Sequence, residues 1–147
     1  MKKSFIATVS VYLLTAFHHY YGSKVYGTPW RAHVVVGGVP ALLLCFLFMV
    51  LYQRFGMRVF LAVYLLACFV LFSLFIGLFE GFYNHLLKNI LFFSGMKEQT
   101  WRMLFPLPAY EKPNDLVFET TGVLQFFVAL VQVYYLRLLW KTAWRRK

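Results

Sequence analysis

The stretch VFLAVYLLACFVLFSLFIGLF, residues 59–79, carries no Lys, Arg, Asp or Glu, and it decides the class of fold. An α-helix needs about 20 apolar residues to cross a hydrocarbon core of about 30 Å. Residues 59–79 satisfy that length, so we predict a transmembrane helix over residues 58–80. Helical character continues beyond it, and we expect an interfacial extension that reaches residue 93.

Three other stretches of the chain have the same apolar character. We predict helices over residues 4–23, 29–53 and 116–140. Thr28 followed by Pro29 is typical of a helix N-cap with proline in the first turn. Arg31 lies at the edge of the second helix, and Glu119 lies about one turn into the fourth. The expected fold is an all-α integral membrane protein, a single domain over 1–147 built as a four-transmembrane-helix bundle.

Composition supports a membrane environment. The chain is 61% hydrophobic and 14% charged, whereas a typical soluble domain is about 45–50% apolar and about 25% charged. The net charge of +10 comes from Lys and Arg at the ends of apolar runs. A nucleic-acid binder concentrates such charge on one polar face, so this distribution disfavours nucleic acid and favours the lipid bilayer as the partner.

The distribution of basic residues also predicts the orientation. With both termini cytoplasmic, the inner side carries no acidic residue and these basic ones: Lys2, Lys3, Arg54, Arg58, Arg137, Lys141, Arg145, Arg146 and Lys147. This positive-inside bias fits a multi-pass protein of a bacterial inner membrane.

Residues 17–21 offer no Ala-x-Ala-like cleavage site, so we read the N-terminal segment as a retained helix rather than a signal peptide.

The connection between the third and fourth helices is predicted to lie on the outer side. It contains Pro106, Pro108 and Pro113, which break regular structure. Trp101 and Tyr110 are aromatic rings of the kind enriched at membrane–water interfaces. We therefore expect an aromatic loop on the outer membrane surface.

Six ionisable side chains from the four predicted helices map to one layer near the outer face: His18, His19, His33, Glu80, His85 and Glu119. Such residues are costly in a bilayer and are functional candidates by default. Because imidazole and carboxylate groups bind divalent transition metals, we predict a metal site. Haem is less favoured, since the fourth helix has no histidine. The spacing matches no HExxH motif, and the sequence leaves open which histidine of the adjacent pair faces inward.

The same layer is compatible with an enzyme that acts on a lipid or lipid-linked substrate. Acid–base catalysis would then use Glu119, Glu80 and His85. The side chains that could hold an amphiphile or its phosphate are Trp30, Arg31, Tyr20, Tyr21 and Arg102. No nucleophile is evident in the sequence.

Two further readings stay open at this point. A small carrier could use the polar stripe from Glu119 to Gln132, but four helices are few for a pathway, so a homo-oligomer would be needed. A structural or accessory subunit would use the polar layer to fix helix register and would bind a partner membrane protein. The sequence by itself does not choose among the four readings.

Overall fold

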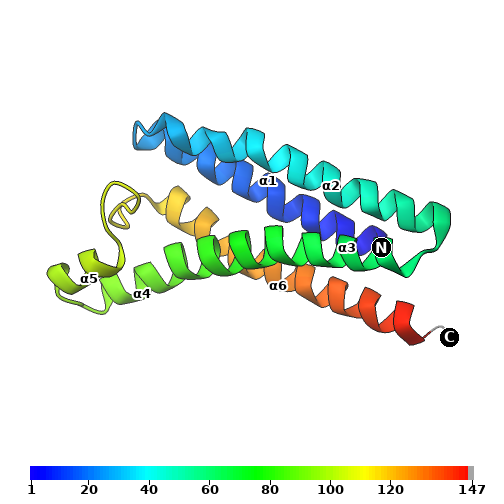
Figure 1. The fold of residues 1–147 in the computed structure, drawn as a ribbon. Helices are drawn as coiled ribbons and strands as arrows, with labels where there is room; N and C mark the ends of the chain where they lie inside the picture. The colour runs from blue at the N-terminus through cyan, green and yellow to red at the C-terminus, as the bar shows by residue number, and fades with distance from the viewer. Residues whose placement is uncertain (146–147) are drawn as a thin grey trace.

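The computed structural model describes residues 1–145, and within them it is all helical without a strand. The long helices run side by side, and the N-terminus lies at the same end as the last turns of the final helix (Figure 1). In chain order the elements are α1 (Lys2–Val25), η1 (Pro29–Ala32), α2 (His33–Phe55), α3 (Arg58–Ala67), η2 (Cys68–Leu87), α4 (Lys88–Phe93), α5 (Glu98–Leu104) and α6 (Leu116–Arg145). The third long segment consists of α3, η2 and α4 together.

Three segments of the described chain are long and apolar enough to cross a membrane: Pro29–Phe55, Arg58–Phe93 and Leu116–Ala143. The helix α1 is 24 residues long, about 36 Å at 1.5 Å per residue. It is less apolar because its buried face carries Ser4, Thr8, Thr15 and His18. The fourth predicted span and the cytoplasmic termini stay predictions.

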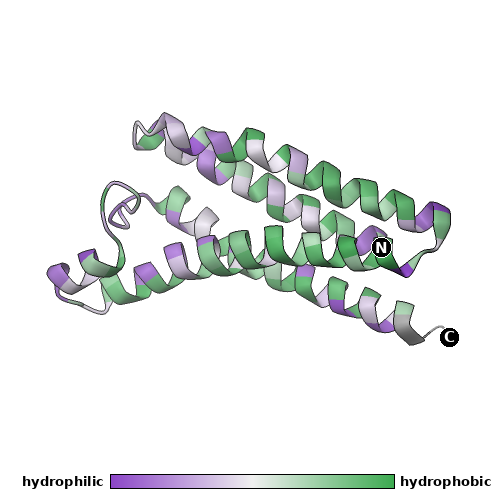
Figure 2. Ribbon diagram, viewed as in Figure 1, coloured by the Kyte–Doolittle hydropathy of each residue, from purple (hydrophilic) through white to green (hydrophobic). Residues whose placement is uncertain are grey.

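The apolar residues of these helices face outward over most of the molecule. Figure 2 shows long hydrophobic stretches along the middle of each long helix, with hydrophilic residues more frequent toward the ends. Large side chains such as Leu13, Leu66 and Phe75 are about 60% exposed. A water-soluble protein rarely exposes a continuous apolar surface of this extent, so the surface fits a lipid environment.

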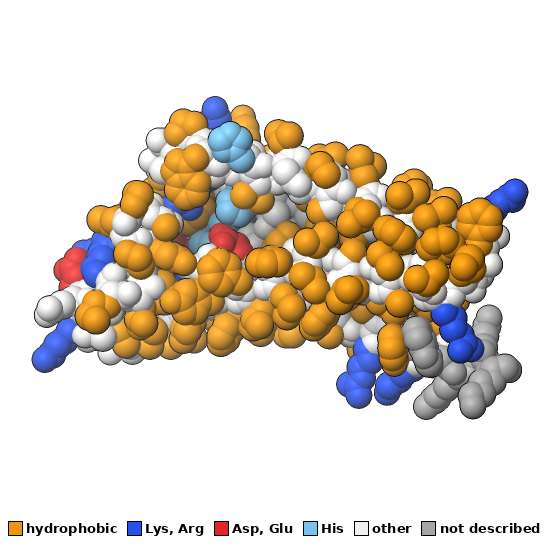
Figure 3. Space-filling view, viewed as in Figure 1, with side chains coloured by type: hydrophobic (Ala, Val, Ile, Leu, Met, Phe, Trp, Pro, Cys, Tyr) orange, Lys and Arg blue, Asp and Glu red, His pale blue; other side chains and the backbone are white. Residues whose placement is uncertain are grey.

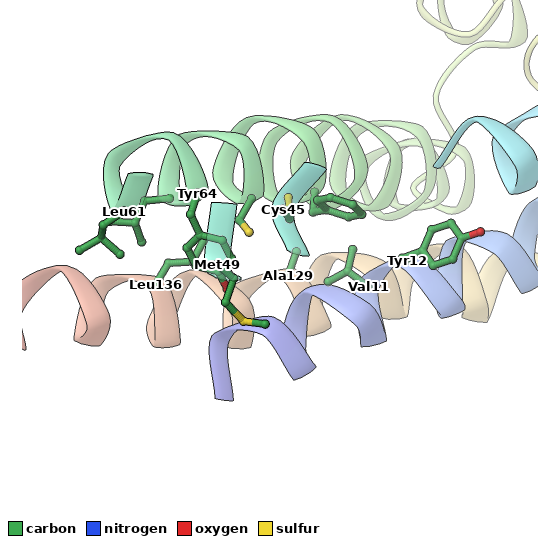
Figure 4. Close-up of a cluster of buried hydrophobic side chains, with 11 residues drawn as sticks. Val11, Tyr12, Cys45, Met49, Leu61, Tyr64, Ala129 and Leu136 are labelled. Atoms are coloured by element: carbon green, nitrogen blue, oxygen red, sulfur yellow. The ribbon is translucent and has the colours of Figure 1, made fainter. Parts of the chain in front are cut away.

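An apolar core lies between the helices toward the end that holds the N-terminus. Figure 4 shows Leu61 and Tyr64 of α3 packed together with Met49 of α2 and Leu136 of α6. Cys45 and Cys68 are fully buried in the same cluster as free thiols.

Polar contacts join the helices at mid-length. The Gln132 amide accepts from Ser73 Oγ at 3.0 Å and donates to Thr8 Oγ1 at 2.8 Å and to the Cys68 carbonyl at 3.2 Å. Thr15 Oγ1 donates to Gln125 Oε1 at 2.9 Å. The small and polar stripe of α6 therefore faces α1 and η2, which is how helices associate in lipid.

The third segment departs from the expected geometry because η2 is a π-helix, which is rarely longer than one turn in proteins. At its end the Lys88 N–H approaches two carbonyls, that of His85 three residues back and that of Tyr83 five residues back. Gly77 and Gly81 face α6, and a Cβ at Gly81 would meet the backbone nitrogen of Phe126. These glycines therefore permit the close approach of η2 and α6.

The segment continues as a helix to Phe93, so the predicted extension exists, while its placement at a membrane interface stays a prediction. The loop that follows differs from expectation in one respect. Trp101 and Phe105 are buried, and Trp101 Nε1 donates to the Lys88 carbonyl at 3.2 Å. These rings fasten the loop to the third segment instead of facing outward.

Candidate metal centre

Three imidazoles surround one carboxylate oxygen at the end of the molecule away from the termini. Glu80 Oε1 on η2 lies 3.7 Å from His18 Nε2 and 3.6 Å from His85 Nε2. His19 Nε2 also lies 3.6 Å from the same oxygen. Four ligands at 2.0–2.2 Å around a tetrahedral metal are separated from one another by about 3.4 Å. The observed spacings are close to that value.

His18, Glu80 and His85 form the compact part of this group, because one ligand atom from each lies within 4.8 Å of the other two. The structure therefore brings together residues from α1 and η2 that are separated by more than 60 positions in the sequence. Histidine and acidic side chains are visible in a hollow of the molecular surface (Figure 3). This His/Glu cluster could bind a metal ion.

His18 is held so that its Nε2 atom is free. Its Nδ1 lies 3.0 Å from Thr121 Oγ1, and that hydroxyl has the Val117 carbonyl at 2.7 Å as its own acceptor. The hydroxyl can then accept a hydrogen bond from His18 Nδ1–H, which assigns the tautomer with a lone pair on Nε2. Within residues 1–145 the buried Nε2 has no hydrogen-bond partner. A buried imidazole nitrogen in this state is suited to a metal.

His85 is oriented by a second carboxylate. Its Nδ1 lies 2.9 Å from Glu119 Oε2, which leaves Nε2 directed toward Glu80. The other oxygen of Glu119 accepts from Lys88 Nζ at 2.7 Å, and both side chains are buried. A histidine that binds metal through one nitrogen usually donates its other N–H to a carboxylate or carbonyl. Glu119 and Lys88 provide that support here.

In Glu80, as in the two histidines, one polar atom is hydrogen-bonded and the other faces the cluster. Its Oε2 accepts from Asn84 Nδ2 at 2.6 Å, which leaves Oε1 facing the imidazoles. Glu80 and His85 are five residues apart, about 140° apart around a helix of 3.6 residues per turn. The wider π-helical geometry of η2 rotates them toward one side.

Packing at the cluster depends on one glycine of α6. A Cβ at Gly122 would overlap the imidazole ring of His85. Phe118, one turn earlier, stacks on His18 with ring centroids 4.1 Å apart and an interplanar angle of 23°. The helix α6 therefore positions both histidines, although it contributes no ligand to the compact group.

A cavity of about 200 Å³ adjoins the cluster, and its lining includes Glu80, His85, Lys88, Arg31, Trp30 and Tyr110. Burial, with the nearby Tyr83 hydroxyl and the Glu80 carboxylate, raises the pKa of Tyr110. That phenol is therefore protonated at neutral pH and can donate a hydrogen bond. Of the predicted substrate-binding residues, the structure places Trp30 and Arg31 on this cavity.

The other predicted site residues lie elsewhere. His33 is exposed on the first turn of α2, because the η1 turn directs Arg31 inward in its place. Tyr20 is 56% exposed, and Tyr21 donates to Asp115 Oδ2 at 3.2 Å. Arg102 donates to the Tyr110 carbonyl at 3.2 Å and is not among the residues that line the cavity.

Comparison with protein families, with curated proteins and with solved structures finds no match to this chain. The interpretation of the centre therefore depends on its geometry.

Three supporting residues are not among the predicted site residues: Asn84 as the partner of Glu80, Lys88 as the partner of Glu119, and Thr121 as the partner of His18. The spacing Glu80, Asn84, Lys88 places these three side chains at successive intervals of four residues. That regular polar spacing in an apolar helix was the available signal for Lys88.

Proposed function

We propose that this chain is a multi-pass membrane protein that binds one divalent transition metal, of the zinc class, through His18, Glu80 and His85. One observation carries the proposal. In each of the three side chains, one polar atom is hydrogen-bonded to a separate partner: Thr121 for His18, Asn84 for Glu80 and Glu119 for His85. The second polar atom of each side chain lies close to those of the other two. A structural hydrogen-bond network needs no such convergence of free lone pairs.

The donor set favours zinc-class metals over haem. Zinc accepts imidazole nitrogen and carboxylate oxygen together, in arrangements such as two histidines and one glutamate. Haem iron takes its axial ligands from His, Cys, Met or Tyr, and a carboxylate in the centre of the group does not fit that chemistry. The described cluster contains no cysteine, so metals that select thiolate are also disfavoured.

We propose further that the centre is of the open kind, with three protein ligands and a position for water or substrate. Open sites with three protein ligands are typical of catalytic zinc, whereas structural zinc has four. The adjoining cavity supports the open form. His19 is the residue that could close it, since its Nε2 also lies 3.6 Å from Glu80 Oε1.

For the membrane topology we propose four spans with both termini cytoplasmic. The N-terminus and the last turns of α6 lie at one end of the helices (Figure 1), and α1 is long enough to span although its inner face is polar. With this orientation the metal centre lies near the outer surface, on the far side from the basic termini.

Metal content of the purified protein tests the proposal. The protein is prepared in mild detergent without chelator or histidine tag, and its metals are measured by plasma mass spectrometry. We expect about one zinc-class ion per chain, with His18→Ala, Glu80→Gln and His85→Ala each retaining less than about a tenth of it. His33→Ala is the matched control and should retain all of it. Equal metal content in all four variants would overturn the proposal.

The same experiment separates the open from the closed centre. His19→Ala should retain metal near the level of the unmodified chain if three ligands suffice. Loss of metal in His19→Ala equal to the loss in His18→Ala would instead indicate a four-ligand, structural site.

A further inference from the structure

The side chain of Arg31 is buried without full hydrogen bonding. It is 5% exposed, and Nη2 donates to the Ala109 carbonyl at 3.3 Å. Within residues 1–145 its Nε–H has no hydrogen-bond partner. Arginine is rarely buried without an anionic partner, and here no carboxylate of the described chain lies within 4.0 Å of the guanidinium. The group is therefore positioned for a ligand.

Aromatic rings fix the plane and place of this guanidinium. Its carbon lies 4.9 Å from the Trp30 ring centroid, 5.3 Å from that of Phe118 and 5.6 Å from that of Tyr26. Such contacts hold arginine in one orientation at little loss of side-chain freedom on binding. The Phe118 ring that contacts Arg31 also stacks on His18. Arg31 and the candidate metal centre are thus built around one ring.

With a divalent metal bound, the net charge around the cavity would be positive and would favour binding of an anion. Arg31 and Lys88 are cationic, and Glu80, Glu111 and Glu119 are acidic. Two cations and a divalent metal against three carboxylates leave an excess of one positive charge. In a low-dielectric site such an excess is costly unless an anion compensates it.

We infer that the cavity between Arg31 and the metal centre binds a phosphate group, with one oxygen at the open coordination position and another on the Arg31 fork. This inference rests on the proposed metal centre. Guanidinium groups bind phosphate oxygens in pairs, and metal ions polarise phosphoryl oxygens. Trp30 lines the cavity while 48% exposed, so an attached alkyl chain can leave along an apolar edge.

Cobalt(II) can be used to follow both metal binding and phosphate binding, because its visible absorption responds to a change in coordination. The full chain in a neutral maltoside detergent is loaded with cobalt, and bound cobalt is quantified first. Inorganic phosphate and hexyl phosphate are then titrated separately into the unmodified chain, Arg31→Gln and Arg31→Lys. Arg102→Gln is the matched control, since Arg102 also donates to a backbone carbonyl and lies 4.8 Å from an indole ring but does not line the cavity.

We expect one cobalt per chain in every variant and a saturable spectral change with phosphate in the unmodified chain. Arg31→Gln should weaken phosphate binding by at least about tenfold, because a charge-assisted pair of hydrogen bonds is lost. The phosphate affinity of Arg31→Lys should lie between those of Arg31→Gln and the unmodified chain, and the affinity of Arg102→Gln should equal that of the unmodified chain. Tighter binding of hexyl phosphate would assign the group to a lipid-like ligand, and equal binding would assign it to free phosphate.

Two results would overturn the inference while leaving the metal centre intact: cobalt bound with no spectral response to either phosphate, or equal phosphate binding by Arg31→Gln and the unmodified chain. Failure to bind cobalt at all would remove the proposed function and the inference with it. Loss of cobalt in Arg31→Gln alone would indicate that this variant is misfolded. The phosphate affinity of Arg31→Lys would then be the test, and an affinity equal to that of the unmodified chain would count against the inference.

Discussion

Glu80 Oε1 lies 3.6 Å from His85 Nε2 although the two residues are five positions apart along one helix. In an α-helix these side chains would point about 140° apart. The π-helical course of η2 places them on one side, where His18 of α1 joins them. π-Helical turns occur frequently at functional sites, and here the departure from α-helical geometry creates the compact part of the cluster.

The space for His85 depends on the absence of a side chain at Gly122, which predicts a specific steric effect. Gly122→Ala would place a methyl group on the imidazole ring and displace it from Glu80. We expect metal affinity to fall by at least about tenfold, since ligands must be held to within about 0.5 Å of productive geometry. Isothermal titration with zinc measures the change.

Gly37→Ala is the control for that substitution, because a Cβ at Gly37 meets nothing within 4 Å. It should bind zinc as the unmodified chain does. Unchanged affinity in Gly122→Ala would show that His85 is not a ligand or that its position is not constrained by α6.

Glu119 is expected to tune the centre and to neutralise Lys88. Glu119→Gln removes the carboxylate that both His85 and Lys88 contact. Loss of an outer partner of a metal-binding histidine typically lowers metal affinity about 10–100-fold. A buried lysine left unpaired is also destabilising, by about 3–5 kcal/mol in water-soluble proteins.

A second substitution separates the two effects of Glu119. Lys88→Met in the Glu119→Gln background should recover thermal stability in detergent without recovering zinc affinity. If zinc affinity returned together with stability, Glu119 would have a structural role only.

Thr121 should matter through the tautomer of His18. Thr121→Val removes the hydroxyl that lies 3.0 Å from His18 Nδ1 while keeping a similar shape. We predict about a tenfold loss of zinc affinity with little change in stability. Thr120→Val, at the exposed neighbouring position, is the control. Equal affinities for the two variants would refute the assigned role of Thr121.

Gln132 tests whether helix association and metal binding are separable. Gln132→Leu removes hydrogen bonds to Ser73, Thr8 and the Cys68 carbonyl. Interhelical hydrogen bonds in membranes contribute about 0.6 kcal/mol on average and at most about 1.7 kcal/mol each. We expect a thermal destabilisation of about 1–3 kcal/mol and an unchanged zinc stoichiometry. Loss of zinc would show that the polar stripe is coupled to the centre.

The fold class was predictable because residues 59–79 form a continuous apolar run, a signal that depends only on composition. Glu119 and the adjacent pair His18 and His19 were also recognisable, since ionisable residues in apolar helices are few, but the sequence did not choose between the two histidines. His33 was placed in the same layer by depth, but its direction depends on the η1 turn, which no periodicity indicates. His85 was placed in the same layer, but its meeting with Glu80 on one side of the helix could not be predicted, because α-helical spacing puts the two side chains about 140° apart and η2 is not α-helical.

X-ray absorption spectroscopy of the zinc-loaded protein identifies and counts the ligand atoms around the metal, and so tests whether His18, Glu80 and His85 bind it. We expect a first shell of nitrogen and oxygen at about 2.0–2.2 Å, with multiple scattering from two imidazoles and no sulfur. A shell that contains sulfur, or one without imidazole scattering, would contradict the assignment of the centre to His18, Glu80 and His85.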